Sequence, residues 1–354
     1  MFPFTMTPQQ AAEELLQFNK KLAAGVTTLG EAGPISAGVS SREAVFTDDK
    51  VVLYRYHPRV EKRHRVPVLV VYALVNRPYM ADLQEDRSLI RGLLDEGMDV
   101  YLIDWGYPDA SDCCLGLDDY INGYIHRCVS HICEAHDLYR INLLGICQGG
   151  TFSLCYTALH PEKVRNLVTT VTPVDFQTPD NLLSHWARKL DVDLLVDTMG
   201  NIPGDLLNQT FLAMSPYRLS GQKYLDMVDL LDQPDKLKNF LRMEKWIFDS
   251  PDQAGEAFRQ FIKDFYQCNG LVKGEVVIGG QQVNLKNITM PVYNVFATLD
   301  HLVPPAASQA LKGLVGSEDY SEFAFKGGHI GIYVSGRAQK EVPPAIANWL
   351  KARG

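Results

Sequence analysis

The sequence has no apolar run long enough to cross a membrane, and it contains no internal repeat and no low-complexity tract. Its seven cysteines have neither the spacing of metal ligands nor that of a disulfide framework, which is typical of a protein from a reducing cytoplasm. Basic residues are also few: 34 Lys and Arg face 42 Asp and Glu, and the formal net charge of -8 argues against a general nucleic-acid binder. The 46% hydrophobic content of the 354 residues indicates a globular protein with a large core.

The beginning of the chain predicts a helix and no targeting segment. Thr7 offers an N-cap, Pro8 occupies the first helical position, and Gln10 completes a capping box. Glu13 and Glu14 interrupt the apolar pattern that follows. The pattern therefore predicts neither a signal peptide nor a membrane span.

A glycine-rich turn after an apolar strand is the most informative segment. The strand is expected over Ile141 to Leu144, and Gly145-Ile146-Cys147-Gln148-Gly149 follows it. This is the form of a nucleophile elbow, with Cys147 where a hydrolase usually carries Ser. Such a turn strains the backbone of its nucleophile, and side chains at the two flanking glycines would collide with the adjacent strand and helix. The alternative is a small buried Cys in a structural turn, because free Cys is often buried.

Two later loops supply the partners that a nucleophile elbow needs. Asp300 follows an apolar strand expected over Pro291 to Ala297, and His329 follows a short strand expected over Phe323 to Phe325. The order nucleophile, acid, His is that of the α/β-hydrolases. Asp300 is expected to orient one ring nitrogen of His329, whose other nitrogen takes the proton from Cys147. Either residue alone could be an ordinary loop residue, but their order and their places after strands favour a triad.

Alternating strands and helices predict an α/β-hydrolase fold, with a mostly parallel central sheet flanked by helices. Several of the strands are continuous apolar runs, as expected where both faces of a sheet are buried. Helical patterns occur around Arg87 to Glu96 and Asp118 to Ala135. The expected strands are residues 51–56, 68–72, 99–103, 141–144, 167–171, 292–296 and 323–325.

One long region interrupts the alternation. Residues 177–285 contain helical patterns rich in large apolar residues and no comparable run of core strands. This predicts a mainly helical cap (lid) inserted into a discontinuous catalytic core of residues 1–176 and 286–354. A cap excludes water and shapes substrate access. The alternative is a helical extension of the core without a gating role.

A cluster of histidines and cysteines could suggest a metal site. His126, Cys128, His131, Cys133 and His136 lie within one expected helix. On a helical wheel Cys128, Cys133 and His136 share the apolar arc, whereas His131 points away. No three soft ligands converge as zinc requires. The pattern indicates a core-facing helix before the nucleophile strand, and no metal is expected.

Taken together, these motifs resemble the catalytic subunits of class III polyhydroxyalkanoate (PHA) synthases. The resemblance extends over nearly the whole chain. The elbow alone also matches dienelactone hydrolases, whereas the Asp-Trp-Gly-Tyr-Pro segment and the long cap do not. The motifs that carry it are Gly145 to Gly150, Tyr101 to Pro108, Thr172 to Phe176, Asp300 to Pro305 and Gly327 to Gly331.

The resemblance implies an acyltransferase that polymerises (R)-3-hydroxyacyl-coenzyme A, typically 3-hydroxybutyryl-coenzyme A, through a covalent Cys147 thioester. A thiolate that attacks a thioester forms another thioester of similar energy, so the acyl group stays activated for transfer to an alcohol. The base for the 3-hydroxyl has been assigned in this family either to the Asp, here Asp300, or to the His, here His329. No cofactor is implied.

The resemblance also has implications for partners and location. At 354 residues the chain is short for such a synthase and shows no long N-terminal extension, so a non-catalytic subunit, PhaE, and a homodimer are expected. The implied location is cytoplasmic, at the surface of PHA granules.

The developing oxyanion needs two backbone donors. One is expected from the amide of Gln148 and the other from the loop after residues 68–72, where Val75 is favoured over Asn76. Two other functions stay open on the same fold. One is a Cys-dependent acyl hydrolase or thioesterase, which differs in admitting water to the acyl-enzyme. The other is a non-catalytic scaffold, against which the complete set of Cys147, Asp300 and His329 argues.

Overall fold

The computed structural model describes residues 38–214, 223–231 and 233–354. The helix expected near Thr7 lies outside the described residues. The chain divides into two compact units, of which the larger combines Gly38–Leu207 with Asp249–Gly354. The described part of the smaller unit lies within Asn208–Phe248. None of the helices in the described ranges is long and apolar enough to span a membrane.

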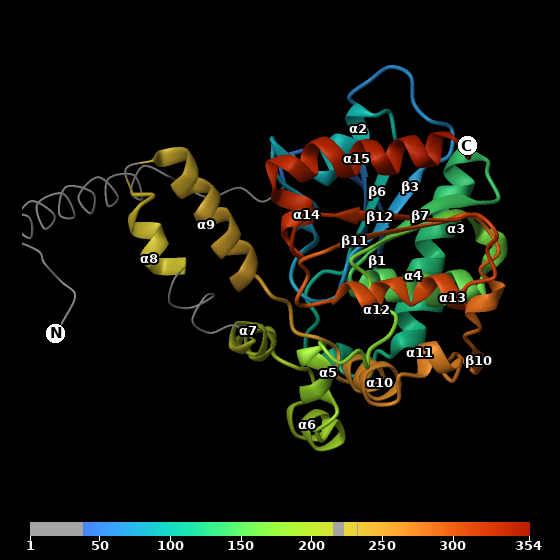
Figure 1. Ribbon diagram of the computed structural model, residues 1–354. Helices are drawn as coiled ribbons and strands as arrows, with labels where there is room; N and C mark the ends of the chain where they lie inside the picture. The colour runs from blue at the N-terminus through green and yellow to red at the C-terminus, as the bar shows by residue number, and fades with distance from the viewer. Residues whose placement is uncertain (1–37, 215–222, 232) are drawn as a thin grey trace, which may run out of the picture. The chain divides into compact units, whose positions relative to one another are not determined.

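An eight-stranded sheet forms the centre of the larger unit (Figure 1), with the order β1-β2-β6-β3-β7-β8-β11-β12. β2 pairs antiparallel with β1 and β6, and the remaining neighbours pair in parallel. This confirms the predicted fold class. The strands are β1 (Arg42–Asp48), β2 (Val51–Tyr56), β3 (Val68–Val71), β6 (Val100–Asp104), β7 (Ile141–Ile146), β8 (Val164–Thr170), β11 (Val292–Ala297) and β12 (Tyr320–Phe325).

The burial of the strands explains which of them the sequence predicted. Every residue of β3, β6, β7 and β11 is buried, because helices cover both faces of the sheet. The seven expected strands are all present. The edge strand β1 was not predicted: its sequence Arg-Glu-Ala-Val-Phe-Thr-Asp has a short apolar run between charged and polar residues, and none of its residues is buried.

Helices lie on the two faces of the sheet. In Figure 1, α2 and α15 lie next to each other on one side, and α3 and α4 lie on the other. The expected helix around Arg87 to Glu96 is the shorter α2, and the one around Asp118 to Ala135 is a π-helical turn, η3, that continues as α3. The bounds are α2 (Leu89–Asp95), η3 (Asp119–Ile125), α3 (His126–His136), α4 (Gln148–Leu159), α12 (Pro305–Gln309), α13 (Leu311–Leu314), α14 (Gly331–Val334) and α15 (Gly336–Lys351).

The chain between β8 and β11 is mainly helical in its described part. Phe261 from this region packs edge-on against Phe152 of α4 and Phe176, with ring centroids 5.8 and 5.7 Å apart. The elements are α5 (Leu182–Ala187), α6 (Val192–Met199), α7 (Gly204–Ala213), α8 (Lys223–Val228), α9 (Pro234–Phe248), α10 (Gly255–Gln260), η6 (Phe261–Gln267), α11 (Gly270–Lys273), β9 (Val277–Ile278) and β10 (Gln281–Gln282).

Short elements complete the larger unit. They are η1 (Pro78–Ala81), β4 (Asp82–Gln84), β5 (Arg87–Ser88), η2 (Ala110–Asp112), η4 (Pro161–Lys163) and η7 (Leu285–Asn287). Of these, η1 and β5 pack against α14, the short helix that follows His329.

Candidate active site

Cys147 occupies the sharp turn between β7 and α4. Its backbone has φ 54° and ψ -125°, a left-handed conformation that non-glycine residues rarely adopt. The amide of Cys147 donates to the carbonyl oxygen of Thr170 at the end of β8, at 2.9 Å. The thiol is partly exposed, whereas the residues around it in the turn are buried. The fold therefore strains the backbone of this residue and presents its thiol above the sheet.

The two flanking glycines are required by close backbone approach. A Cβ on Gly145 would lie 2.4 Å from the Cα of Gly150 in α4. A Cβ on Gly149 would lie 2.3 Å from the carbonyl oxygen of Val71 in β3. Since both neighbours are backbone atoms, neither can move aside cheaply. This confirms the steric reason for the glycine spacing of the elbow.

Asp300 and His329 come together from the loops after β11 and β12. The Nδ1–H of His329 donates to Oδ2 of Asp300 at 2.7 Å, which fixes the ring tautomer because a carboxylate can only accept. The other oxygen, Oδ1, accepts from the amides of Leu302 and Val303, each at 2.9 Å. The Asp300 side chain is 0% exposed. Its carboxylate is thus sealed from solvent and held in one orientation.

Cys147 is the second neighbour that raises the pKa of His329. Burial lowers the pKa of His329, but the charges of Asp300 and Cys147 and the hydrogen bond to Asp300 outweigh it and raise the pKa to about 10. An imidazole with a raised pKa holds a proton at neutral pH. The structure therefore brings the three predicted residues together: Asp300 binds His329, and Cys147 acts on the same ring.

The two predicted oxyanion donors lie on two segments that are connected by a hydrogen bond to the Gln148 side chain. The amide of Leu74, just before Val75, donates to Oε1 of the buried Gln148 at 3.0 Å. Within the described ranges, the backbone amides of Gln148 and Val75 donate a hydrogen bond to no protein group. By contrast, Asn76 has φ 57°, and its side chain donates to Oγ of Ser250 at 2.6 Å.

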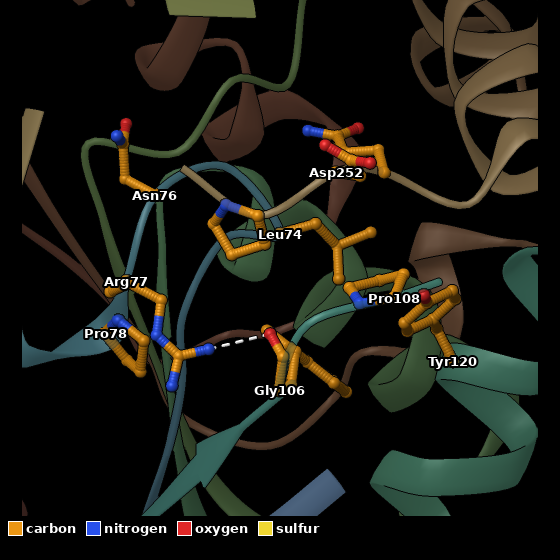
Figure 2. A pocket seen from close by; sticks show the side chains of 11 residues that line it. Leu74, Asn76, Arg77, Pro78, Gly106, Pro108, Tyr120 and Asp252 are labelled. Carbon is orange, nitrogen blue, oxygen red and sulfur yellow. Dashed lines mark hydrogen bonds between the residues drawn. The ribbon is translucent and has the colours of Figure 1, made fainter. Parts of the chain in front are cut away.

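The Asp-Trp-Gly-Tyr-Pro segment supports the same loop. Nη2 of Arg77 pairs with the carboxylate of Asp104 at 2.8 Å, and Nη1 donates to the carbonyl oxygen of Gly106 at 2.7 Å (Figure 2). Nε1 of Trp105 donates to the carbonyl oxygen of Tyr72 at 2.9 Å. These contacts fix both ends of the loop that carries Val75. The adjoining small pocket, which Asn76 and Asp252 help to line, is not lined by the three predicted catalytic residues.

Three tyrosines around Cys147 were missed by the sequence analysis. Burial, followed by the charge of Cys147, raises the pKa of Tyr72 and of Tyr266 above its ordinary value. Tyr333 is buried as well, and Tyr72, Cys147 and Asp300 add to the effect of burial on its pKa. All three phenols therefore stay protonated and can donate hydrogen bonds. Of the three, only Tyr333 could have been suspected from the sequence, because it lies four residues after His329.

The histidine and cysteine cluster of α3 has ordinary partners. The ring of His126 hydrogen-bonds to the Tyr156 hydroxyl at 3.2 Å, and that of His136 to the Tyr101 hydroxyl at 2.8 Å. His131 stacks on Phe46. Cys128 and Cys133 are buried in the core. In the described part of the chain, no three His, Cys, Asp or Glu side chains converge as a metal site requires.

The fold and this arrangement define an α/β-hydrolase-fold protein with cysteine at the nucleophile position. A family model for the alpha/beta hydrolase fold matches residues 66–335. Solved structures with the same fold include a putative lipase from Sulfolobus solfataricus (TM-score 0.56, 16% identity, covering 89% of this chain and 98% of that one). A monoacylglycerol lipase from Paleococcus ferrophilus has a TM-score of 0.53 and 18% identity over 85% of this chain and 99% of that one. At these identities the likeness concerns the fold alone.

Sequence relatives identify the family. A model for the poly-beta-hydroxybutyrate polymerase (PhaC) N-terminus matches residues 34–93. The chain is 66% identical to the poly(3-hydroxyalkanoate) polymerase subunit PhaC of Allochromatium vinosum over the full length of both. It is 54% identical to that of a Synechocystis species, covering 98% of this chain and 94% of the relative. The chain belongs to the PhaC family of poly(3-hydroxyalkanoate) polymerase subunits, which are enzymes of acyltransferase type.

Proposed function

We propose that this protein polymerises (R)-3-hydroxyacyl-coenzyme A, with 3-hydroxybutyryl-coenzyme A as the typical substrate, into polyhydroxyalkanoate and releases coenzyme A. The observation that carries the proposal is the grouping of Cys147, at a strained turn, with His329, which Asp300 binds. A cysteine in this position suits a thioester substrate. The thioester formed on the enzyme retains the driving force for ester formation in the next step.

Before acylation, the Cys147 proton already lies on the His329 nitrogen that does not face Asp300, in keeping with the raised pKa of that ring. The thiolate then attacks the thioester carbonyl carbon, and the carbon–oxygen double bond opens to an oxyanion. The unpaired amides of Gln148 and Val75 stabilise this oxyanion. Its collapse breaks the bond to the coenzyme A sulfur, which leaves with the proton held by His329. The enzyme now carries an acyl thioester on Cys147.

Elongation uses the imidazole of His329 again, now as the base for a hydroxyl group. His329 takes the proton of a 3-hydroxyl group, whose oxygen attacks the carbonyl carbon of the Cys147 thioester. The carbon–sulfur bond breaks as the ester bond forms, and the freed Cys147 thiolate beside the protonated His329 restores the starting state. We assign this role to His329 because Asp300 is sealed, with its two oxygens already accepting from His329, Leu302 and Val303. Asp300 then acts by holding the ring in the productive tautomer.

Residues 177–285 act in this scheme as a cap that excludes water from the acyl-enzyme. Support comes from Phe261, which packs against Phe152 in the helix that starts at the elbow. Exclusion of water favours transfer to an alcohol over hydrolysis. The protein works in the cytoplasm at the granule surface, as a homodimer with a second, non-catalytic PhaE subunit.

The proposal is tested by following two products at once. Purified protein is incubated with 3-hydroxybutyryl-coenzyme A, while free thiol and turbidity are recorded together. Polymerase activity predicts that both signals rise and that Cys147→Ala abolishes both. The matched control is Cys268→Ala, which removes an exposed thiol. Thiol release with free acid and no turbidity would instead identify a thioesterase.

A further inference from the structure

Tyr333 is a buried residue that the proposed reaction does not yet use. It lies in α14, directly after the loop that carries His329, and its side chain is 1% exposed. In the part of the chain that the structure describes, its hydroxyl has no hydrogen-bond partner. A buried hydroxyl without a partner is destabilising, because it has lost its bonds to water and gained none. Such a group in a native protein calls for an explanation.

The position of Tyr333 is fixed by its backbone. Its amide donates to the carbonyl oxygen of Ile330 at 3.0 Å, and its own carbonyl oxygen accepts from Nε2 of Gln339 in α15 at 2.5 Å. The oxygen of the same Gln339 side chain accepts from the amide of Ser88 at 2.8 Å. The unpaired hydroxyl is therefore held in place by contacts that do not involve it.

Tyr333 lies four residues after His329, in the short helix that follows the His329 loop. Burial is the main reason why the pKa of Tyr333 lies well above the ordinary value for Tyr. The charges of Tyr72, Cys147 and Asp300 raise it further. The phenol stays protonated and can donate one hydrogen bond to whatever acceptor enters the site.

We propose that the Tyr333 hydroxyl donates a hydrogen bond to the 3-hydroxyl oxygen of the acyl group that is loaded on Cys147. This inference rests on the proposed function and deepens it, because it names a determinant of specificity for 3-hydroxyacyl groups. The other candidate acceptors on the substrate are accounted for. The thioester carbonyl oxygen is assigned to the amides of Gln148 and Val75, and a thioether-like sulfur accepts hydrogen bonds only weakly.

The same contact discriminates against acyl groups without the hydroxyl. A substrate that brings no acceptor leaves the Tyr333 hydroxyl buried and unpaired in the complex. A site built to hydrogen-bond a substrate hydroxyl rejects the analogue that lacks it for this reason. Butyryl-coenzyme A, which differs from 3-hydroxybutyryl-coenzyme A by one oxygen atom, is therefore the poorer acyl donor.

The test compares these two substrates in Tyr333→Phe, which removes only the hydroxyl. Single-turnover acylation of Cys147 is measured for each substrate, and iodoacetamide alkylation of Cys147 reports the intact nucleophile. We expect the preference for the hydroxylated substrate to fall roughly 10- to 100-fold, through slower acylation by 3-hydroxybutyryl-coenzyme A. Alkylation stays unchanged, and the melting temperature does not fall because no hydrogen bond is lost. The matched control is Tyr156→Phe, whose hydroxyl contacts His126, and it leaves the preference unaltered.

Several outcomes overturn the inference. An unchanged preference in Tyr333→Phe refutes it, as does an equal loss with both substrates. If the variant does not fold, the wild-type protein still decides, since equal acylation by the two substrates excludes any hydroxyl contact in the acyl site. Failure of the wild-type protein to take an acyl group from either substrate refutes the proposed function itself, independently of Tyr333.

Discussion

Replacing Asp300 with Asn tests how the acid contributes to catalysis. Oδ1 of Asp300 accepts from two backbone amides, and Oδ2 accepts from Nδ1 of His329. Asn has only one oxygen. If that oxygen stays with the two amides, its NH₂ group faces Nδ1, which must then become an acceptor. The ring proton moves to the nitrogen that faces Cys147, and that nitrogen can no longer accept the thiol proton.

The alternative amide orientation does not rescue the variant. It would direct the NH₂ group at the amides of Leu302 and Val303, so that three donors would meet without an acceptor. The backbone therefore selects the wrong tautomer of His329. In serine proteases the corresponding wrong tautomer lowers the rate about 10⁴-fold. We expect a loss of about that size here, and we expect it already in the acylation step.

Single-turnover labelling with a radioactive acyl-coenzyme A measures this step without elongation. Asp300→Asn and His329→Gln should lose acylation to a similar extent. Asp175→Asn is a suitable control, because this carboxylate accepts from the amide of Gln177 and from Asn269 and contacts no member of the triad. Near-normal acylation by Asp300→Asn with failed polymerisation would refute the tautomer argument and make Asp300 the base of elongation.

The remaining predictions concern the nucleophile, the pH dependence and the partner. Cys147→Ala should abolish acylation with an unchanged unfolding curve, and Cys147→Ser should be severely impaired because a hydroxyl ionises less readily than a thiol; normal turnover by the Ala variant would contradict the assignment. The folded-state pKa of His329, about 10, exceeds its ordinary value of 6.5, so its stabilising contribution is complete below pH 6.5 and is lost as the pH rises through 10. The stability difference between wild type and His329→Gln, from urea unfolding, should therefore shrink between these pH values, and a constant difference would count against the ion pair. The isolated chain should polymerise slowly after a lag that PhaE shortens, since a partner that prefers an open cap shifts the population toward it; full activity without a lag would remove the need for gating.

The sequence predicted most of the fold because its signals are local. Apolar runs such as Val68–Val71 and Val292–Ala297 mark strands buried on both faces. The strand β1 was not predicted because Arg42–Asp48 lies at the sheet edge, has only a short apolar run and has no buried face. Edge strands owe their position to pairing with a neighbour, here β2, which no pattern within the strand reveals.

The candidate site was predictable to the same degree. Cys147, Asp300 and His329 could be named because each follows a strand in a fixed order, and parallel strands deliver their following loops to one edge of the sheet. Tyr72, Tyr266 and Tyr333 could not be named, since one directly follows β3, one lies in a helix of the inserted region and one lies in α14. Their convergence on Cys147 depends on tertiary packing between segments far apart in the chain.

The central claim is that Cys147 carries the acyl group during polymerisation. Protein quenched in acid soon after mixing with 3-hydroxybutyryl-coenzyme A, then digested and analysed by mass spectrometry, tests it most directly. The account predicts a hydroxyacyl thioester on the peptide that contains Cys147, absent from Cys147→Ala and released by hydroxylamine. Polymer formation with an unmodified Cys147 peptide, or with the acyl group on another residue, would contradict the account.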